Sequence, residues 1–192
     1  MQSKQRCPWV GENPLMITYH DEEWGVPLHD DRKLFEFLVL DAFQAGLSWN
    51  TVINKRKNFE KAFHQFDAKK IAKYGEKDFN RLMDDAGIVS NRAKIRATIQ
   101  NANVFLEVQK ECGTFDAYIW QFTRKVITHR IKSLNDYVAR SAESDAMSKD
   151  MGARGFSFVG STICYAFMQA AGMVNDHSVD CFRKKQLSVE QK

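Results

Sequence analysis

Two cysteines and two histidines lie at opposite ends of this chain and carry the side chains that Zn²⁺ prefers. Cys7 and His20 are separated by twelve residues, and His177 and Cys181 by three. The second spacing places both side chains one turn apart on a helix face, where they can bind one ion. Four such ligands would close a structural site and join the two termini. The alternative is four unrelated polar residues, because widely split pairs are a weaker signal than two CxxC pairs.

A second group of reactive and aromatic residues lies in the segment LDAFQAGLSW, residues 40–49. It combines a carboxylate at Asp41, a turn at Gly46 and an indole at Trp49, which can line one cleft. An indole stacks well on a flat base, above all on a cationic one, and Tyr19 can add a second wall. The alternative is that Trp49 belongs to the core and Asp41 to a solvated helix face, as is common for these residue types.

The segment RLMDDAGIVSNRAKI, residues 81–95, predicts two helices joined by a hairpin at Gly87. Glycine allows the tight turn, and free N–H groups at the start of the next helix favour an anion such as a DNA phosphate. Lys94 would add a charge contact. A plain corner between two helices, closed by a glycine, explains the same residues, so this segment alone leaves DNA binding open.

Composition bounds the class of protein. A chain of 192 residues is long enough for one domain with its own core. Its four cysteines come without a secretory segment, so we expect a reducing, cytoplasmic setting. The apolar run at 158–174 holds polar residues and is short for a membrane span, so we expect a buried helix and no membrane partner. The net charge of +4 permits a nucleic-acid partner without requiring one.

The elements that must position these residues are predicted to be helices. All three prolines fall within the first 27 residues, which predicts an irregular N-terminal segment and a helical body after it. An aspartate at 30 or 31 can cap a helix that runs to about Ala45, and another starts near Ser48. Further helices are expected at 76–85, 91–112, 115–122, 145–154 and 158–174, and a frayed tail from Phe182. Together they predict an all-α globule.

Several blocks, taken in their order and spacing, resemble the 3-methyladenine DNA glycosylase I family. They are Cys7-Pro8-Trp9, YHDEEWGVP (19–27), LDAFQAGLSW (40–49), DDAGIVSNRAKI (84–95), RGFSFVGSTICYAFMQAAGMVNDH (154–177) and Cys181. The resemblance covers nearly the whole chain. It implies a helix-hairpin-helix DNA glycosylase fold in one domain, residues 1–192, with helical lobes around a base-binding cleft and with termini joined by a structural zinc.

The resemblance also implies a role for individual side chains. The zinc ligands would be Cys7, His20, His177 and Cys181. The base pocket would be formed by Tyr19, Trp49 and Trp24, with Asp41 as the catalytic carboxylate. The DNA would be held by Gln44 and Leu47, which fill and wedge the opened duplex, and by Gly87 and Lys94 at the hairpin.

The activity that the resemblance implies is base excision from alkylated DNA. A monomeric enzyme would flip N3-methyladenine out of double-stranded DNA, hydrolyse its glycosidic bond, release the free base and leave an abasic site, without lyase activity. We expect Trp49 and Tyr19 to sandwich the cationic base and Asp41 to recognise it. Asp176 is a candidate for the catalytic aspartate that related glycosylases carry, but its neighbour His177 favours a supporting role near the metal.

One residue departs from the family pattern, which has glutamate where this chain has Asp41. The aspartate keeps the charge but is one methylene shorter, and a misfit at a buried polar contact costs about 1–3 kcal/mol. This departure motivates a rival interpretation, a protein that binds alkylated DNA without excising the base. A hydrolase with an open zinc site is a second rival, which the four complete ligands disfavour. A purely structural helical protein is a third and leaves the combination of motifs unexplained.

Overall fold

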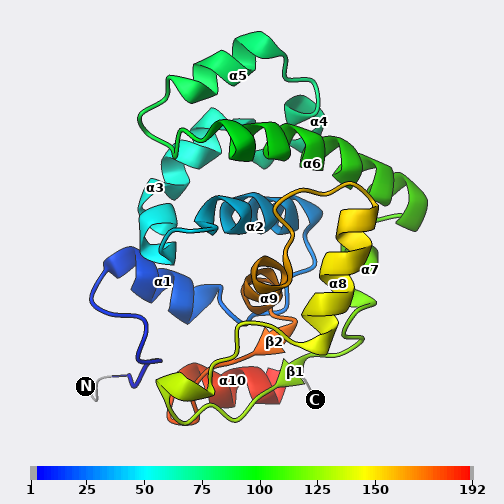
Figure 1. The fold of residues 1–192 in the computed structure, drawn as a ribbon. Helices are drawn as coiled ribbons and strands as arrows, with labels where there is room; N and C mark the ends of the chain where they lie inside the picture. Colours follow the sequence, from blue (N-terminus) through cyan, green and yellow to red (C-terminus); the bar gives the residue numbers. More distant parts are fainter. Residues whose placement is uncertain (1–3, 191–192) are drawn as a thin grey trace.

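The computed structural model describes residues 4–190, and helices dominate it (Figure 1). The helices in chain order are α1 (Pro14–Glu22), α2 (Asp31–Gln44), α3 (Trp49–Ala62), α4 (Ala68–Ile71), α5 (Glu76–Met83), α6 (Arg92–Cys112), α7 (Phe115–Trp120), α8 (Ala142–Ala153), α9 (Ser161–Ala170) and α10 (Phe182–Glu190). Two 3₁₀ turns, η1 (His64–Phe66) and η2 (Leu134–Asp136), lie between them. The predicted helical architecture is confirmed, but the chain is not purely helical, because it also contains one short pair of strands.

The helices that carry the site begin where the sequence places their caps. Asp30 accepts a hydrogen bond from the backbone of Lys33 at the start of α2, and Ser48 does the same for Thr51 at the start of α3. Such caps satisfy N–H groups that have no partner within the helix. The turn between α2 and α3 is short and passes through Gly46 at φ +77°, a conformation that glycine adopts without strain.

The N-terminal segment is more regular than predicted. Residues 14–22 form α1, because Pro14 occupies its first turn, where a missing N–H is harmless, and Asn13 caps the backbone of Leu15. The prediction of a frayed tail from Phe182 is also wrong. Phe182 begins α10, and Leu187 is fully buried against the rest of the chain.

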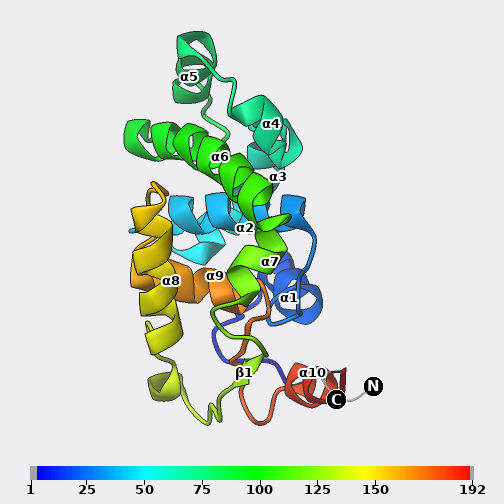
Figure 2. The same ribbon diagram turned by 90° about the vertical axis from the view of Figure 1, so that its right-hand side faces the viewer.

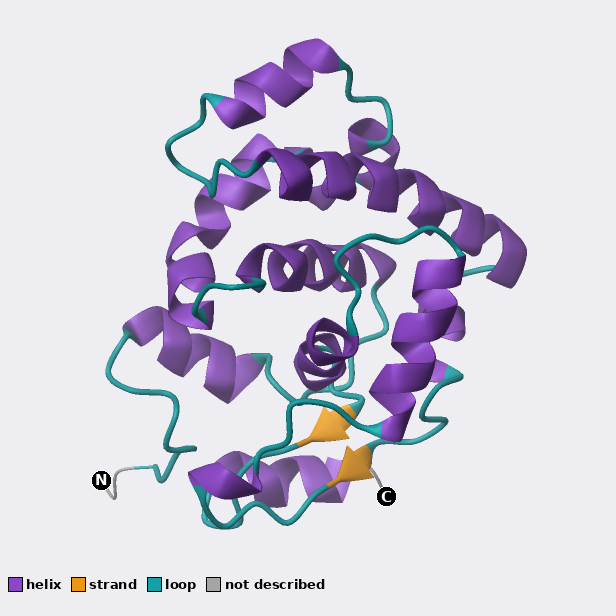
Figure 3. Cartoon of the chain, in the orientation of Figure 1, coloured by secondary structure: helices purple, strands orange, loops and turns teal. Residues whose placement is uncertain are grey.

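Helix α9 is shorter than predicted. It begins at Ser161, since Phe158 has φ +58°, and it ends at Ala170, before Gly172 at φ +69°. The chain then forms a short strand, β2 (Val174–Asn175), that pairs in parallel with β1 (Ile127–Thr128). Figure 3 shows this pair in orange near the C-terminal helix. His177 and Cys181 therefore lie in the turn that follows β2 and not on the helix face predicted for them.

The two ends of the described chain meet. The backbone N–H of Phe182, at the start of α10, donates to the carbonyl of Gln5, and the views in Figures 1 and 2 agree that α10 lies beside the N-terminal segment. A continuous apolar core runs through the helices and reaches Cys7 and Cys181. No helix among residues 4–190 combines the length and apolar character that a membrane span requires.

Candidate functional site

A cavity of about 330 Å³ opens between α1, α2, the start of α3, α9 and the η2 turn. Its lining is mainly aromatic and amide-bearing, with one carboxylate. The lining residues are Trp9, Tyr19, Trp24, Asp41, Gln44, Trp49, Leu134, Tyr137, Ala166 and Gln169. The structure therefore brings the predicted pocket residues Tyr19, Trp24, Asp41 and Trp49 to one place, from three helices and the turn that follows α1. The volume and the flat, apolar walls suit a single planar ring system.

Asp41 supplies the acidic group of this cavity. It lies in the last turns of α2 and is 2% exposed. Its Oδ2 atom is buried without a hydrogen-bond partner, and desolvation raises the pKa of the carboxyl well above its ordinary value. A buried carboxylate oxygen without a partner is costly in a folded protein. It therefore indicates a polar or cationic ligand that enters the cavity.

One indole among the lining residues has no partner. The Nε1 atom of Trp49 is buried and unpaired within the described chain, whereas the hydroxyl of Tyr137 lies beside the Cys7 thiol and the Trp9 indole. A purine offers ring nitrogens that accept such hydrogen bonds and an exocyclic amine that donates to a carboxylate. The carboxylate of Asp41 and the unpaired indole N–H of Trp49 thus fit a flat heterocycle that has both a donor and an acceptor edge.

Tyr19 and Trp49 form one wall and do not face each other across a gap. Their ring centroids are 5.0 Å apart at an interplanar angle of 46°. A base between two rings needs about 3.5 Å on each side, so the predicted sandwich between these two side chains is wrong. Trp9 and Trp24 form a second aromatic pair, with centroids 4.8 Å apart. Both pairs line the cavity.

Gln44 and Leu47 lie at the turn that follows α2. Gln44 lines the cavity, and Leu47 is 41% exposed although its side chain is large and apolar. Lys94, buried on α6, donates to the carbonyls of Phe43 and Ala45 at 2.8 and 2.6 Å. A cation suits the carbonyl end of a helix. The lysine is thus engaged in holding this turn, a position that does not support the phosphate contact predicted for it.

The hairpin at Gly87 joins α5 and α6 as predicted, but its polar groups have partners. The N–H of Gly87 donates to Asp85 at 2.8 Å. The carbonyl of Gly87 accepts from Lys55 and Asn58, both at 3.2 Å. Lys55, on α3, therefore braces the hairpin. N–H groups for an anion would have to come from the start of α6, where Asn91 caps Lys94.

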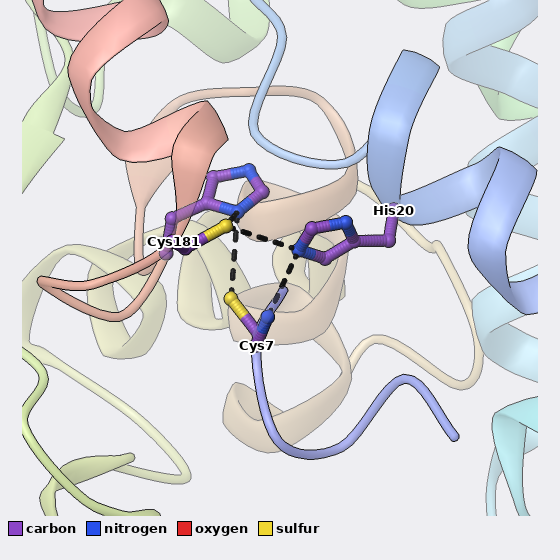
Figure 4. Close-up of side chains that lie close together, drawn as sticks. Cys7, His20 and Cys181 are labelled. Atoms are coloured by element: carbon purple, nitrogen blue, oxygen red, sulfur yellow. Dashed lines mark hydrogen bonds between the residues drawn. The ribbon is translucent and has the colours of Figure 1, made fainter. Parts of the chain in front are cut away.

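Cys7, His20, His177 and Cys181 converge into one buried cluster. Their ligand atoms all lie within 4.8 Å of one another, and Figure 4 shows Cys7, His20 and Cys181 pointing toward a common centre. His177 Nδ1 is 3.5 Å from the sulfur of Cys7 and 3.4 Å from that of Cys181. Hydrogen bonding from Cys181 lowers the pKa of the Cys7 thiol. The structure therefore brings together the four residues that the sequence singled out, in a group that could hold a metal ion.

The second nitrogen of each imidazole is held away from the cluster. His20 Nδ1 is 2.7 Å from a carboxylate oxygen of Asp21, which Arg6 also binds. His177 Nε2 is 2.9 Å from the carbonyl of Trp24. The Asp21 carboxylate and the Trp24 carbonyl each accept a hydrogen bond from a ring N–H, which leaves the other ring nitrogen with its lone pair directed at the thiols. This arrangement orients histidine ligands in metal sites, so the donor set fits a tetrahedral zinc site with two thiolates and two imidazoles.

Asp176 is fully buried behind the cavity, and its oxygens have partners. His129 lies 2.7 Å from one oxygen, and Tyr165 and Gln169 donate to the other at 2.7 and 2.8 Å. The network holds Gln169, a cavity residue, and agrees with the supporting role expected for Asp176.

Five cavity residues were not found from the sequence: Trp9, Leu134, Tyr137, Ala166 and Gln169. Trp9 and Gln169 lie within the blocks that carry the family resemblance, so that signal was available. Leu134 and Tyr137 lie in an irregular segment without a periodic pattern, and only the fold brings them to the cavity.

Comparison with known proteins agrees with this site. The sequence model of the family described as methyladenine glycosylase matches residues 9–184. DNA-3-methyladenine glycosylase 1 of Escherichia coli (strain K12) is 48% identical over 178 residues, which are 92% of this chain and 95% of that protein.

Solved structures extend the likeness to the fold. A crystal structure of 3-methyladenine DNA glycosylase I has a TM-score of 0.90 and 47% identity, over 93% of this chain and 98% of that one. A Staphylococcus aureus structure, described as the structural basis of 3-methyladenine recognition, has a TM-score of 0.89 and 32% identity, over 93% and 96%. The chain therefore belongs to the methyladenine glycosylase family.

Proposed function

We propose that this protein excises 3-methyladenine from alkylated double-stranded DNA by hydrolysing the N-glycosidic bond, and that it leaves an abasic site. The observation that carries the proposal is Asp41, a buried carboxylate with an unpaired oxygen in an aromatic cavity the size of one base. The cavity belongs to a chain whose relatives are DNA-3-methyladenine glycosylases. The carboxylate matches the cationic lesion in charge, and the aromatic walls match its flat shape.

The base must leave the duplex before it can enter this cavity. Leu47, exposed on the turn after α2, is placed to wedge the opened stack, and Gln44 beside it connects the turn to the cavity. Lys94 holds the turn from behind through the carbonyls of Phe43 and Ala45. We therefore propose that Lys94 positions the wedge and that the Gly87 hairpin supports the DNA backbone, which carries no sequence information.

The cavity selects a cationic purine. Methylation at N3 leaves a positive charge on the base in DNA, and the faces of Tyr19, Trp49 and Trp24 attract a cation. Asp41 accepts a hydrogen bond from the exocyclic amine and offsets the charge of the bound lesion. An unmodified adenine brings no charge with which to pair the buried carboxylate, so it binds less well.

The bond that breaks joins C1′ of the deoxyribose to N9 of the base. Its electron pair moves to the cationic ring, which departs as neutral 3-methyladenine, and the sugar develops positive charge. Water then adds to C1′ and releases a proton to solvent. Asp41 stabilises the positive charge as it develops on the sugar, an electrostatic role. The lining residues of the cavity in the described chain include no lysine, which favours hydrolysis without a Schiff base.

We propose that the terminal cluster holds one structural zinc ion. Cys7, His20, His177 and Cys181 would bind it, and four protein ligands leave no position for a reactive water. The ion would contribute folding energy by joining the N-terminal segment to the turn before α10. This leaves the chemistry to the cavity residues.

The rival interpretation is a protein that binds the lesion and does not cut. The observation behind it is Asp41, which replaces the family glutamate with a shorter side chain and keeps an unpaired oxygen. The decisive experiment incubates the purified protein with methylated duplex DNA and separates the released bases by chromatography. A dominant 3-methyladenine peak supports excision. DNA binding without a released base would overturn the proposed function in favour of the rival.

A further inference from the structure

We propose that residues 129–140, which we call the lesion-strand arm, hold the DNA strand that carries the everted nucleotide. Leu134 packs on the deoxyribose of that nucleotide, and basic side chains of the arm hold the neighbouring phosphates. The inference rests on the proposed function and adds a part of the surface to which nothing above assigns a DNA contact.

The position of Leu134 at the entrance of the cavity carries the argument. Leu134 lines the cavity and is also 60% exposed, so it lies where the cavity meets solvent. A base inside the cavity stays bonded to its sugar until cleavage, and the sugar must then lie at the entrance. A large apolar side chain at that place contacts the apolar edge of the sugar and loses its own exposure to water.

The arm is held in place, which a contact surface for DNA requires. Ile131 is buried, pairs with Ser178 in a parallel bridge, and accepts a hydrogen bond from Val179 N at 2.8 Å. Asp136 accepts from the backbone N–H groups of Lys132 and Ser133, both at 2.8 Å, and so closes the η2 turn. Leu134 is thus exposed from an ordered turn.

The charge of the arm fits a phosphate backbone. Arg130, Lys132 and Arg140 are exposed. The only acidic side chain between residues 129 and 140 is Asp136, whose carboxylate is engaged with backbone N–H groups. Exposed cations beside an exposed apolar residue are the arrangement that grips a strand by its sugars and phosphates.

The arm and the turn after α2 bracket the same cavity. The turn contributes Gln44 to the lining and the arm contributes Leu134 and Tyr137. Both the C-terminal end of α2 and the arm lie toward the left side of Figure 2. Leu47 on the turn and Leu134 on the arm are both exposed, so each of these two segments, which both contribute to the cavity lining, carries an apolar side chain that can contact the everted nucleotide.

The test compares Leu134→Ala with Val138→Ala, a matched control on the same arm that is 50% exposed and does not line the cavity. Single-turnover excision from methylated duplex DNA should fall about tenfold in Leu134→Ala, the effect of losing one buried leucine contact, and stay unchanged in Val138→Ala. Binding of free 3-methyladenine, followed by tryptophan fluorescence, should be unchanged in both, because the free base has no sugar. Unchanged excision in Leu134→Ala, or an equal loss in the control or in free-base binding, would overturn the inference.

A second variant tests the charge of the arm. Lys132→Gln removes one exposed cation and keeps the backbone N–H that Asp136 binds. Its affinity for duplex DNA with a stable abasic analogue should depend less on salt, with a log–log slope smaller by about one. An unchanged slope would contradict a phosphate contact. This assay needs no cleavage, so it judges the arm even if wild-type protein releases no base and the proposed function fails.

Discussion

Asp41→Asn should make the protein more stable and nearly inactive at the same time. The substitution keeps the shape of the side chain and removes its charge. In the wild type the carboxyl is 2% exposed, its Oδ2 has no partner, and desolvation raises its pKa well above the ordinary 3.8. The folded protein therefore bears a cost for the ionised group that an amide largely avoids.

The pH dependence of this effect has a definite sign. Because the pKa of Asp41 is higher in the folded than in the unfolded chain, the folded state binds the extra proton. Wild-type stability thus falls as the pH rises from the unfolded value of 3.8 up through the raised folded value. Above that window we expect Asp41→Asn to be more stable by about 1–3 kcal/mol, the cost of an unsatisfied buried polar group. For a chain of this size each kcal/mol corresponds to about 2–4 °C in Tm.

Excision should fall by a factor of about 10²–10³, as for the loss of one electrostatic contact to a transition state. Calorimetry from mildly acidic to alkaline pH measures the stability, and single-turnover release of 3-methyladenine measures the activity. Glu107→Gln, which neutralises an exposed carboxylate on α6, is the matched control and should change neither. A lower Tm for Asp41→Asn than for wild type, or excision at the wild-type rate, would refute the reasoning.

Further predictions concern the metal, the pH profile and one close backbone contact. Cys181→Ala should lower zinc content and Tm, whereas Cys112→Ala, outside the cluster, should leave both unchanged in metal analysis and calorimetry. The kcat/KM for excision should rise with pH as Asp41 ionises, with its inflection above 3.8, and a pH–rate profile without that limb would exclude Asp41 as the titrating group. Gly172→Ala should cost about 2–4 kcal/mol in urea unfolding, because its Cβ would meet the Val26 carbonyl carbon at 2.1 Å and φ is +69°. A urea unfolding midpoint for Gly172→Ala equal to that of the wild type would contradict this close contact.

Local signals in the sequence predicted much of the fold. The caps at Asp30 and Ser48 and the apolar periodicity that follows them set α2 and α3, and these helices carry Asp41 and Trp49. The four residues of the terminal cluster were predictable because their side-chain chemistry is distinctive. The predictions that failed concern residues whose positions depend on contacts between distant segments. Lys94 has the charge of a phosphate ligand, and the sequence predicted that role for it. In the structure its ammonium group donates instead to the carbonyls of Phe43 and Ala45 at the end of α2.

The irregular segments also depend on contacts that the sequence does not reveal. The arm at residues 129–140 has neither helical nor strand periodicity, so its place could not be inferred. Its register comes from backbone pairing with residues 175–179, through His129, Ile131 and Val179. Those partners lie in the turn that also carries His177. The position of Tyr137 and Leu134 at the cavity therefore depends on pairing that no local pattern encodes.

The terminal cluster and the base cavity are coupled through shared side chains. Tyr19 and His20 are neighbours on α1, one facing the cavity and the other the cluster. Trp24 lines the cavity. Its backbone carbonyl accepts a hydrogen bond from His177, and the centroids of the Trp24 ring and that imidazole are 4.7 Å apart. An ion that fixes the two imidazoles would also fix the cavity wall and, through Ser178, the arm. Removal of the proposed zinc ion should therefore weaken base binding before it unfolds the chain.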